Sequence, residues 1–81
     1  MQRVSAKIDV EGHLSALGSA IRALRTSRGY SQEALALATG IDRSHMGRIE
    51  RGERNLTLLN LIRIAQAIDC KPSDILIASG L

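Results

Sequence analysis

The chain has 81 residues, of which 44% are hydrophobic and 23% are charged, and its formal net charge is +3. A chain of this length forms one small domain that buries about 60% of the surface its unfolded form exposes. This size leaves no room for a second core and makes a catalytic cleft on a separate scaffold hard to fit. Tyr30 is the single aromatic residue, so aliphatic side chains must fill the core.

The basic residues are mostly arginine, which accounts for nine of the eleven Lys and Arg side chains. The modest positive excess favours an anionic partner. A guanidinium can also bind phosphate or guanine through two hydrogen bonds, which a lysine cannot do.

Cys70 is the single cysteine, so no disulfide can form within the chain. The chain also opens without the apolar run that a signal peptide or a membrane span requires. We therefore expect a cytoplasmic protein that does not contact a membrane.

Residues 1–12 mix charged, serine and β-branched residues without a clear period, and we expect an N-terminal arm or an extra helical turn there. The remaining residues, 13–81, are predicted to form the domain. Its first helix covers residues 13–28, where Leu14, Leu17, Ile21 and Leu24 recur at spacings of three and four residues. Gly29 then ends this helix.

Two short helices joined by a tight turn are predicted for residues 31–51. Ser31 can cap the start of the second helix, and Gly40 suits its end because glycine adopts a left-handed backbone easily. Asp42 can cap a third helix that runs from Arg43 to about Arg51. This layout is typical of a helix-turn-helix, whose second helix lies in the major groove of DNA.

Two further helices are predicted after a polar loop. The fourth covers residues 57–68, and its apolar stripe consists of Leu58, Leu61, Ile64, Ala65 and Ile68. The fifth begins at Pro72, whose missing N–H costs nothing in a first helical turn, and ends at Gly80. No stretch has the period-two pattern of a strand. We therefore predict an all-α, compact five-helix domain.

The third helix has a core face and an outward face. At about 100° per residue, Met46 and Ile49 point toward the core. The residues expected to contact base edges on the opposite side are Arg43, Ser44, Gly47 and Arg48. Small residues leave room for base edges, and arginines reach guanine. Exposed arginines alone are usually solvated charges, so the preceding turn is what favours the DNA-binding interpretation.

Contacts with the DNA backbone are expected at the start of the second helix and around the third. The residues expected to make them are Ser31, Gln32, His45, Arg51, Arg54 and Asn55. Simple capping is the alternative for Gln32 and Asn55, and His45 could equally be a plain surface residue.

Glu50 lies near the core side of the third helix, where an unpaired carboxylate would be costly. We expect Arg25 of the first helix to form a structural ion pair with it.

These motifs together resemble the lambda-type repressor and Cro group of helix-turn-helix proteins, the Xre family. The resemblance covers about residues 17–76. Its motifs are Ser31-Gln32-x-x-Leu35-Ala36-x-x-x-Gly40-Ile41, Ile49-Glu50-Arg51-Gly52 and Leu58-x-x-Leu61-x-x-Ile64-Ala65. It implies that Gln32 contacts the DNA backbone or a base, that the outward residues of the third helix read bases, and that the Arg25–Glu50 pair is structural.

Within that group, residues 42–55 resemble the small controller proteins of restriction–modification systems. Those proteins act as homodimers that regulate their own gene and the endonuclease gene. Phage repressors and antitoxin domains share most of this stretch. The resemblance implies a regulator of transcription, a repressor or an activator, and an activator would also contact RNA polymerase.

A single domain of this kind contacts roughly four or five base pairs, which is too few for useful specificity. We therefore expect a homodimer on a two-fold symmetric operator with half-sites about 34 Å apart. The residues expected at the dimer interface are Leu59, Ile62, Ile75, Leu76, Ile77 and Leu81, because one helix face cannot bury them all. The alternative for Ile75 and Leu76 is packing in the monomer core.

We predict no enzymatic activity, metal or cofactor, because His13, His45 and Cys70 are scattered and no metal-binding spacing occurs. No small-molecule ligand is expected, since a second domain would not fit. The alternative function is a partner-binding module, such as an antitoxin that masks a toxin and uses the same domain for autoregulation.

Overall fold

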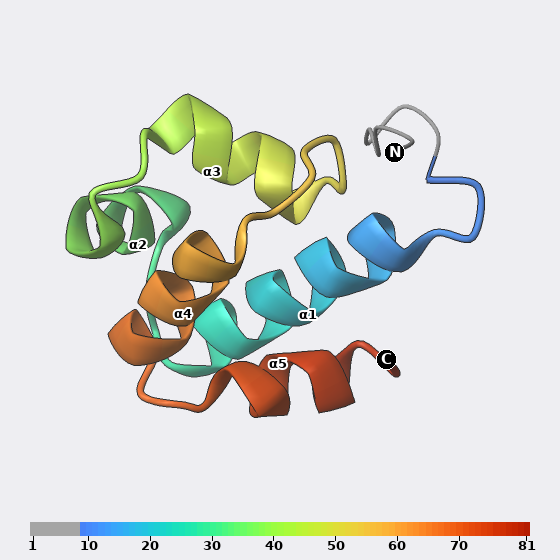
Figure 1. Ribbon diagram of the computed structural model, residues 1–81. Coiled ribbons are helices and arrows are strands. Elements are labelled where there is room, and N and C mark those ends of the chain that lie inside the picture. Colours follow the sequence, from blue (N-terminus) through green and yellow to red (C-terminus); the bar gives the residue numbers. More distant parts are fainter. Residues whose placement is uncertain (1–8) are drawn as a thin grey trace.

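The computed structural model describes residues 9–81, and this part of the chain folds into helices without strands. The five helices are α1 (His13–Ser27), α2 (Gln32–Thr39), α3 (Arg43–Glu50), α4 (Leu58–Ala67) and α5 (Pro72–Ala78). α1 packs against α3 and α5, while α2 packs against α3 and α4, so α3 lies on one side of the domain and α5 on the other (Figure 1). The predicted all-α fold is confirmed.

Side-chain caps explain where α2, α3 and α4 begin, and the predicted bounds differ from the observed ones by at most two residues. The hydroxyl oxygens of Ser31 and Thr57 accept hydrogen bonds from the backbone N–H groups of Ala34 (3.0 Å) and Asn60 (3.1 Å). Asp42 caps α3 in the same way, with its carboxylate 3.1 Å from the backbone nitrogen of Ser44. These caps satisfy N–H groups that have no partner within the helix.

Asp9 lies in the segment predicted to be an N-terminal arm or an extra helical turn, and its side chain supports the start of α1, whose N-cap residue is Gly12. Its carboxylate accepts hydrogen bonds at 3.0 Å from the backbone N–H groups of His13 and Leu14. Residues 9–12 therefore form a turn that leads into the helix. Residues 1–8 of the predicted arm lie outside the described residues.

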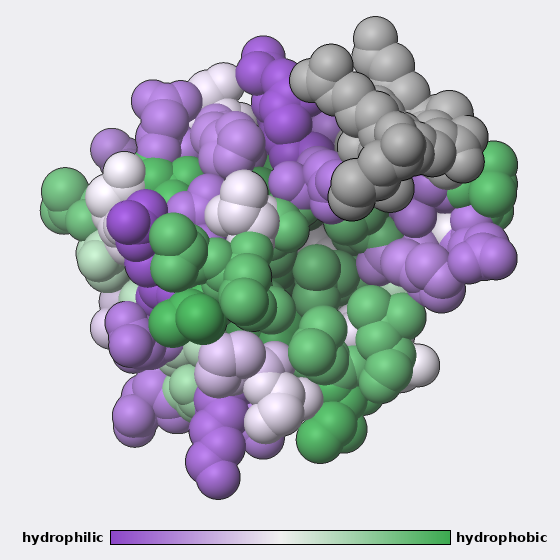
Figure 2. Space-filling model, in the orientation of Figure 1, coloured by the Kyte–Doolittle hydropathy of each residue, from purple (hydrophilic) through white to green (hydrophobic). Residues whose placement is uncertain are grey.

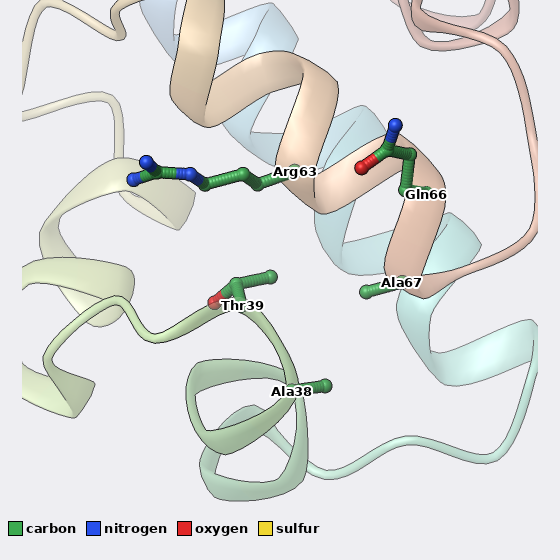
Figure 3. A pocket seen from close by; sticks show the side chains of 5 residues that line it. All are labelled: Ala38, Thr39, Arg63, Gln66 and Ala67. Atoms are coloured by element: carbon green, nitrogen blue, oxygen red, sulfur yellow. The ribbon is translucent and has the colours of Figure 1, made fainter.

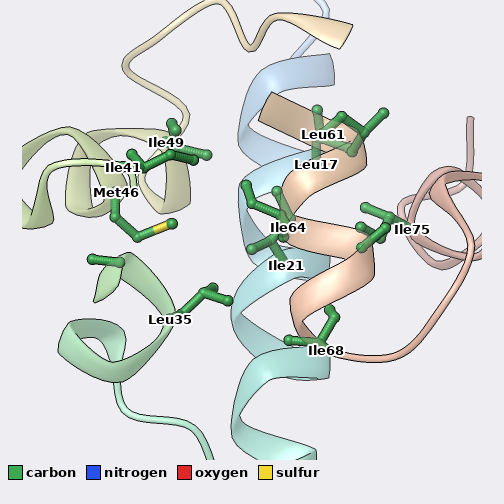
Figure 4. Close-up of a cluster of buried hydrophobic side chains, with 12 residues drawn as sticks. Leu17, Ile21, Leu35, Ile41, Met46, Ile49, Leu61, Ile64, Ile68 and Ile75 are labelled. Carbon is green, nitrogen blue, oxygen red and sulfur yellow. The ribbon is translucent and has the colours of Figure 1, made fainter. Parts of the chain in front are cut away.

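Aliphatic side chains from all five helices form one core (Figure 4). Ile21, Leu35, Met46, Ile64 and Ile75 are completely buried. Met46 and Ile49 point inward as predicted. The prediction for Leu58 is wrong, because it is 69% exposed at the first turn of α4. The apolar stripe predicts which side of α4 faces the core, but it does not show whether other helices cover the first turn of α4.

α1 and α3 approach so closely that their backbones touch. A Cβ atom added to Gly18 would lie 2.5 Å from the carbonyl oxygens of Ile49 and Glu50. Gly52, which follows α3 with a φ of +75°, would place a Cβ atom 2.6 Å from the Cα of Ser15. The C-terminal end of α3 is therefore fixed against α1, which leaves the opposite face of α3 directed outward.

Candidate nucleic-acid interface

The outward face of α3 carries three of the four residues predicted to contact bases. Arg43, Ser44 and Arg48 are exposed, and the core residues of the same helix lie on its other side. Asp42 caps the N-terminal turn of α3, and this turn contains both Arg43 and Ser44. The helix thus presents two arginines and a small hydroxyl residue at one surface.

The fourth of these residues, Gly47, is buried, so its predicted exposure is wrong. A Cβ atom at Gly47 would lie 3.1 Å from Nη1 of Arg51 and 3.3 Å from Oε1 of Gln32. These two longer side chains cover the glycine. Gly47 therefore provides space for its neighbours, and a helical wheel of α3 alone does not show them.

The predicted ion pair between Arg25 and Glu50 is present in the structure. Nε of Arg25 donates to Oε2 of Glu50 at 2.7 Å, and Nη2 donates to Oε1 at 2.9 Å. Nη1 of Arg25 donates to the backbone oxygen of Tyr30 at 2.9 Å. Both charged residues are 7% exposed, so the pair joins α1, the chain before α2 and the end of α3 inside the domain.

Gln32 is tied to this ion pair, which the sequence analysis missed. Its Nε2 donates to Oε1 of Glu50 at 3.1 Å, and the side chain is half-buried. Capping of α2 is done by Ser31, not by Gln32. The inward position of Glu50 could have indicated this contact, because a buried carboxylate can accept more hydrogen bonds than Arg25 donates.

The other residues predicted to contact the DNA backbone lie around this face. Ser31, Arg51, Arg54 and Asn55 are exposed, and His45 is half-buried. The hydroxyl oxygen of Ser31 is occupied as a cap acceptor, so its part in binding an anion would come from its hydroxyl hydrogen or the backbone.

Arg51 pairs with Glu53, an acidic residue that the sequence analysis did not consider. Nε of Arg51 donates to Oε2 of Glu53 at 3.0 Å. The hydrogen bond from Arg51, together with the charges of Arg51, Arg48 and Arg54, lowers the pKa of Glu53 below its ordinary value. Glu53 thus stays ionised within a basic surface.

A second surface, formed by α4 and α5, is apolar (Figure 2). Its most exposed residues are Leu58, Leu59, Ile77 and Leu81, each more than half exposed. Ile62 of α4 and Leu76 of α5 are half-buried. The prediction that Ile75 belongs to this surface is wrong, because Ile75 is completely buried in the core. α5 packs against both α1 and α4, and this packing covers Ile75.

The described surface has further features outside these two faces. A recess of about 330 Å³ between α2 and α4 is lined by Ala38, Thr39, Arg63, Gln66 and Ala67, of which only Arg63 is charged (Figure 3). Within residues 9–81, no group of three His, Cys, Asp or Glu side chains could hold a metal ion. Burial raises the pKa of the Cys70 thiol. None of the helices described is long and apolar enough to cross a membrane.

Comparison with known proteins identifies the family. The helix-turn-helix family model HTH_3 matches residues 21–75. Control protein C.SmaI of Serratia marcescens is 38% identical over 65 residues, which cover 80% of this chain and 77% of that protein. Control protein C.BamHI of Bacillus amyloliquefaciens is 38% identical over 60 residues, which cover 73% of this chain and 74% of that protein.

A solved structure supports the same assignment. The restriction-modification controller protein C.AhdI from Aeromonas hydrophila is similar in fold, with a TM-score of 0.75, and is 45% identical. The similarity covers 76% of this chain and 94% of that one. The matched segment contains α2, α3 and the residues around them, so the chain belongs to the helix-turn-helix family.

Proposed function

We propose that the protein is a transcriptional regulator that binds double-stranded DNA in a sequence-specific manner. The observation that carries the proposal is the outward face of α3, where Arg43, Ser44 and Arg48 are exposed while the C-terminal end of the same helix is fixed against α1. A helix held from behind in this way can enter the major groove without a change of shape.

The proposed contacts fall into two kinds. Arg43, Ser44 and Arg48 contact base edges, because they project from the helix that would occupy the groove. The residues proposed to contact phosphates are Ser31, Gln32, His45, Arg51, Arg54 and Asn55, which lie around this helix. Gly47 acts indirectly by leaving space for Gln32 and Arg51.

We propose further that two copies bind together as a homodimer through the apolar surface on α4 and α5. Leu59, Ile77 and Leu81 would contact the second copy, with Ile62 and Leu76 at the edge and Leu58 added to the predicted set. Exposed apolar residues gathered on one face support this, since isolated domains rarely leave such a patch in water. A two-fold dimer would bind a two-fold symmetric operator.

The similarity to control proteins supports a role as the controller of a restriction–modification system. As such a controller, the protein would act on DNA in the cytoplasm. A controller that activates transcription would also contact RNA polymerase.

The proposal is tested by selection from a pool of randomised duplex DNA at about physiological salt. We expect enrichment of a motif with two-fold symmetry and half-sites about one helical turn apart. Retention of all sequences alike, lost steeply as salt rises, would contradict sequence-specific binding.

A further inference from the structure

The side-chain amide of Gln32 is fixed by a buried carboxylate at the edge of the proposed DNA-binding surface. Gln32 is the first residue of α2 and is half-buried, whereas the Glu50 side chain that accepts its hydrogen bond is 3% exposed. The distance from Nε2 of Gln32 to Oε1 of Glu50 is 3.1 Å. A neutral surface side chain is thus anchored by a charge inside the domain.

The chemistry of Glu50 determines which way the amide points. An ionised carboxylate only accepts hydrogen bonds, so it must face the NH₂ group of Gln32 and not its carbonyl oxygen. The carbonyl oxygen Oε1 then lies over Gly47. Since an amide nitrogen has two hydrogens and Glu50 takes one, one N–H remains for an acceptor outside the protein.

Arg25 completes this arrangement from the other side. Both oxygens of Glu50 accept hydrogen bonds from Arg25, and the backbone oxygen of Tyr30 holds the guanidinium. The carboxylate therefore cannot rotate away from Gln32 without breaking two charge-assisted hydrogen bonds. A side chain that is already ordered loses little conformational entropy when it binds.

We propose that Glu50 and Arg25 are positioning residues for DNA binding, because together they orient the Gln32 amide so that its remaining N–H donates to a phosphate oxygen. This inference rests on the DNA-binding function proposed above. It gives the ion pair a role in affinity as well as in stability, although neither charged group contacts DNA.

The test removes the ion pair without leaving a buried charge. Replacement of a buried pair by apolar residues of similar volume is often neutral for stability. The double variant, Arg25→Met with Glu50→Leu, should therefore remain folded while Gln32 loses its anchor. Affinity for the selected operator is measured at a temperature at which circular dichroism shows every variant to be folded.

We expect the double variant and Gln32→Ala each to bind the operator roughly three- to tenfold more weakly, the range for one lost hydrogen bond. Adding Gln32→Ala to the double variant should change the affinity less than twofold. Ile68→Val, which alters the core away from this surface, should bind like the unchanged protein. Equal affinity of the double variant and the unchanged protein, or effects that simply multiply, would overturn the inference.

A second measurement does not depend on the folding of any variant. In the unchanged protein, nuclear magnetic relaxation should show the Gln32 side-chain amide to be as rigid as the backbone and that of exposed Gln66 to be mobile. A mobile Gln32 amide would refute the positioning role. Absence of sequence-specific binding by the unchanged protein would instead refute the proposed function.

Discussion

The Arg25 guanidinium and the Glu50 carboxylate form a two-point ion pair, with nitrogen–oxygen distances of 2.7 Å and 2.9 Å, that joins α1 to the last residue of α3. Its position inside the domain means that neither charge can be rehydrated without partial unfolding. The pair therefore couples the stability of the domain to the orientation of the helix proposed to enter the groove.

Replacing Arg25 alone should destabilise the domain strongly. Arg25→Ala leaves the Glu50 carboxylate buried without its main partner, and we expect a loss of about 3–5 kcal/mol in the free energy of unfolding. Urea denaturation at fixed protein concentration measures this loss. Arg22→Ala, an exposed site on the same helix, serves as the control and should change stability by less than about 0.5 kcal/mol. Equal effects of the two changes would remove the structural role assigned to the pair.

Gly18→Ala should also destabilise the protein, because the new methyl group would meet two backbone carbonyl oxygens of α3 at 2.5 Å. Backbone cannot move aside as a flexible side chain can, so we expect a cost of about 1–3 kcal/mol despite the better helix propensity of alanine. Ser19→Ala, at an exposed neighbouring site, is the matched control. The midpoint temperature of thermal unfolding measures the effect of each change. An unchanged midpoint for Gly18→Ala would show that α1 and α3 can move apart.

Arg48 and Arg54 should affect DNA binding in different ways. Arg48→Ala should cost about 1–3 kcal/mol on the operator and relax the preference at one base position, because it would remove the proposed base contact. Arg54→Ala should weaken binding to all duplexes alike and reduce the salt slope by about one unit, because it would remove the proposed phosphate contact. Titrations of both variants on operator and scrambled duplexes distinguish the roles. Identical behaviour across sequences would contradict the division into base and phosphate contacts.

Glu53 should weaken DNA binding in the unchanged protein, since it places a negative charge among Arg48, Arg51 and Arg54. We expect Glu53→Gln to bind all duplexes more tightly, with a steeper salt dependence, because Arg51 is released toward the phosphates. Binding measured over a range of salt concentrations tests this. A weaker complex would mean that the Arg51–Glu53 pair is needed to orient Arg51.

The lowered pKa of Glu53 predicts how the stability contributed by the Arg51–Glu53 pair changes with pH. Because its pKa in the folded protein is lowered, the Arg51–Glu53 pair contributes to stability above the ordinary carboxyl pKa. That contribution is lost as the pH falls through the lowered value. An NMR titration should find the pKa of Glu53 below its ordinary value, and Arg51→Ala should raise it. An unshifted Glu53 pKa in the unchanged protein would argue against the pairing in solution.

The apolar surface on α4 and α5 should control the oligomeric state. Ile77→Lys places a charge where two copies would meet, so we expect dissociation to monomers by light scattering. Leu37→Lys is the matched control, because Leu37 is also a largely exposed apolar residue but lies on α2. If the unchanged protein is monomeric at high micromolar concentration, the dimer proposal is contradicted.

Much of the fold could be predicted from the sequence because its signals are local. Ser31, Asp42 and Thr57 cap helices through atoms within three residues, and Gly40 adopts its left-handed backbone whatever packs nearby. Apolar periodicity likewise identified the buried faces of α1 and α3. Glu50 could be paired with Arg25 because its position on the helix left it no access to water.

The errors concern how elements meet in space. Gly47 was predicted to be exposed because a wheel of α3 does not include Gln32, which arrives from α2 and covers it. Ile75 was assigned to the dimer surface because a short terminal helix gives no sign of which side faces its neighbours. The prediction for Leu58 failed for a related reason, since the first buried residue of α4 is Leu61, one turn further along the helix. Each of these depends on contacts between segments far apart in the sequence.

The backbone contact of Gly18 with α3 has a consequence for how such proteins diverge. The scaffold holds α3 through main-chain atoms, through the buried side chains of Met46 and Ile49 and through Glu50, and none of these belongs to the outward side chains. Residues 43, 44 and 48 can therefore be exchanged without disturbing the support beneath them. Transplanting these three residues from a relative should transfer its operator preference while the melting behaviour stays that of the recipient, so target choice can evolve independently of folding.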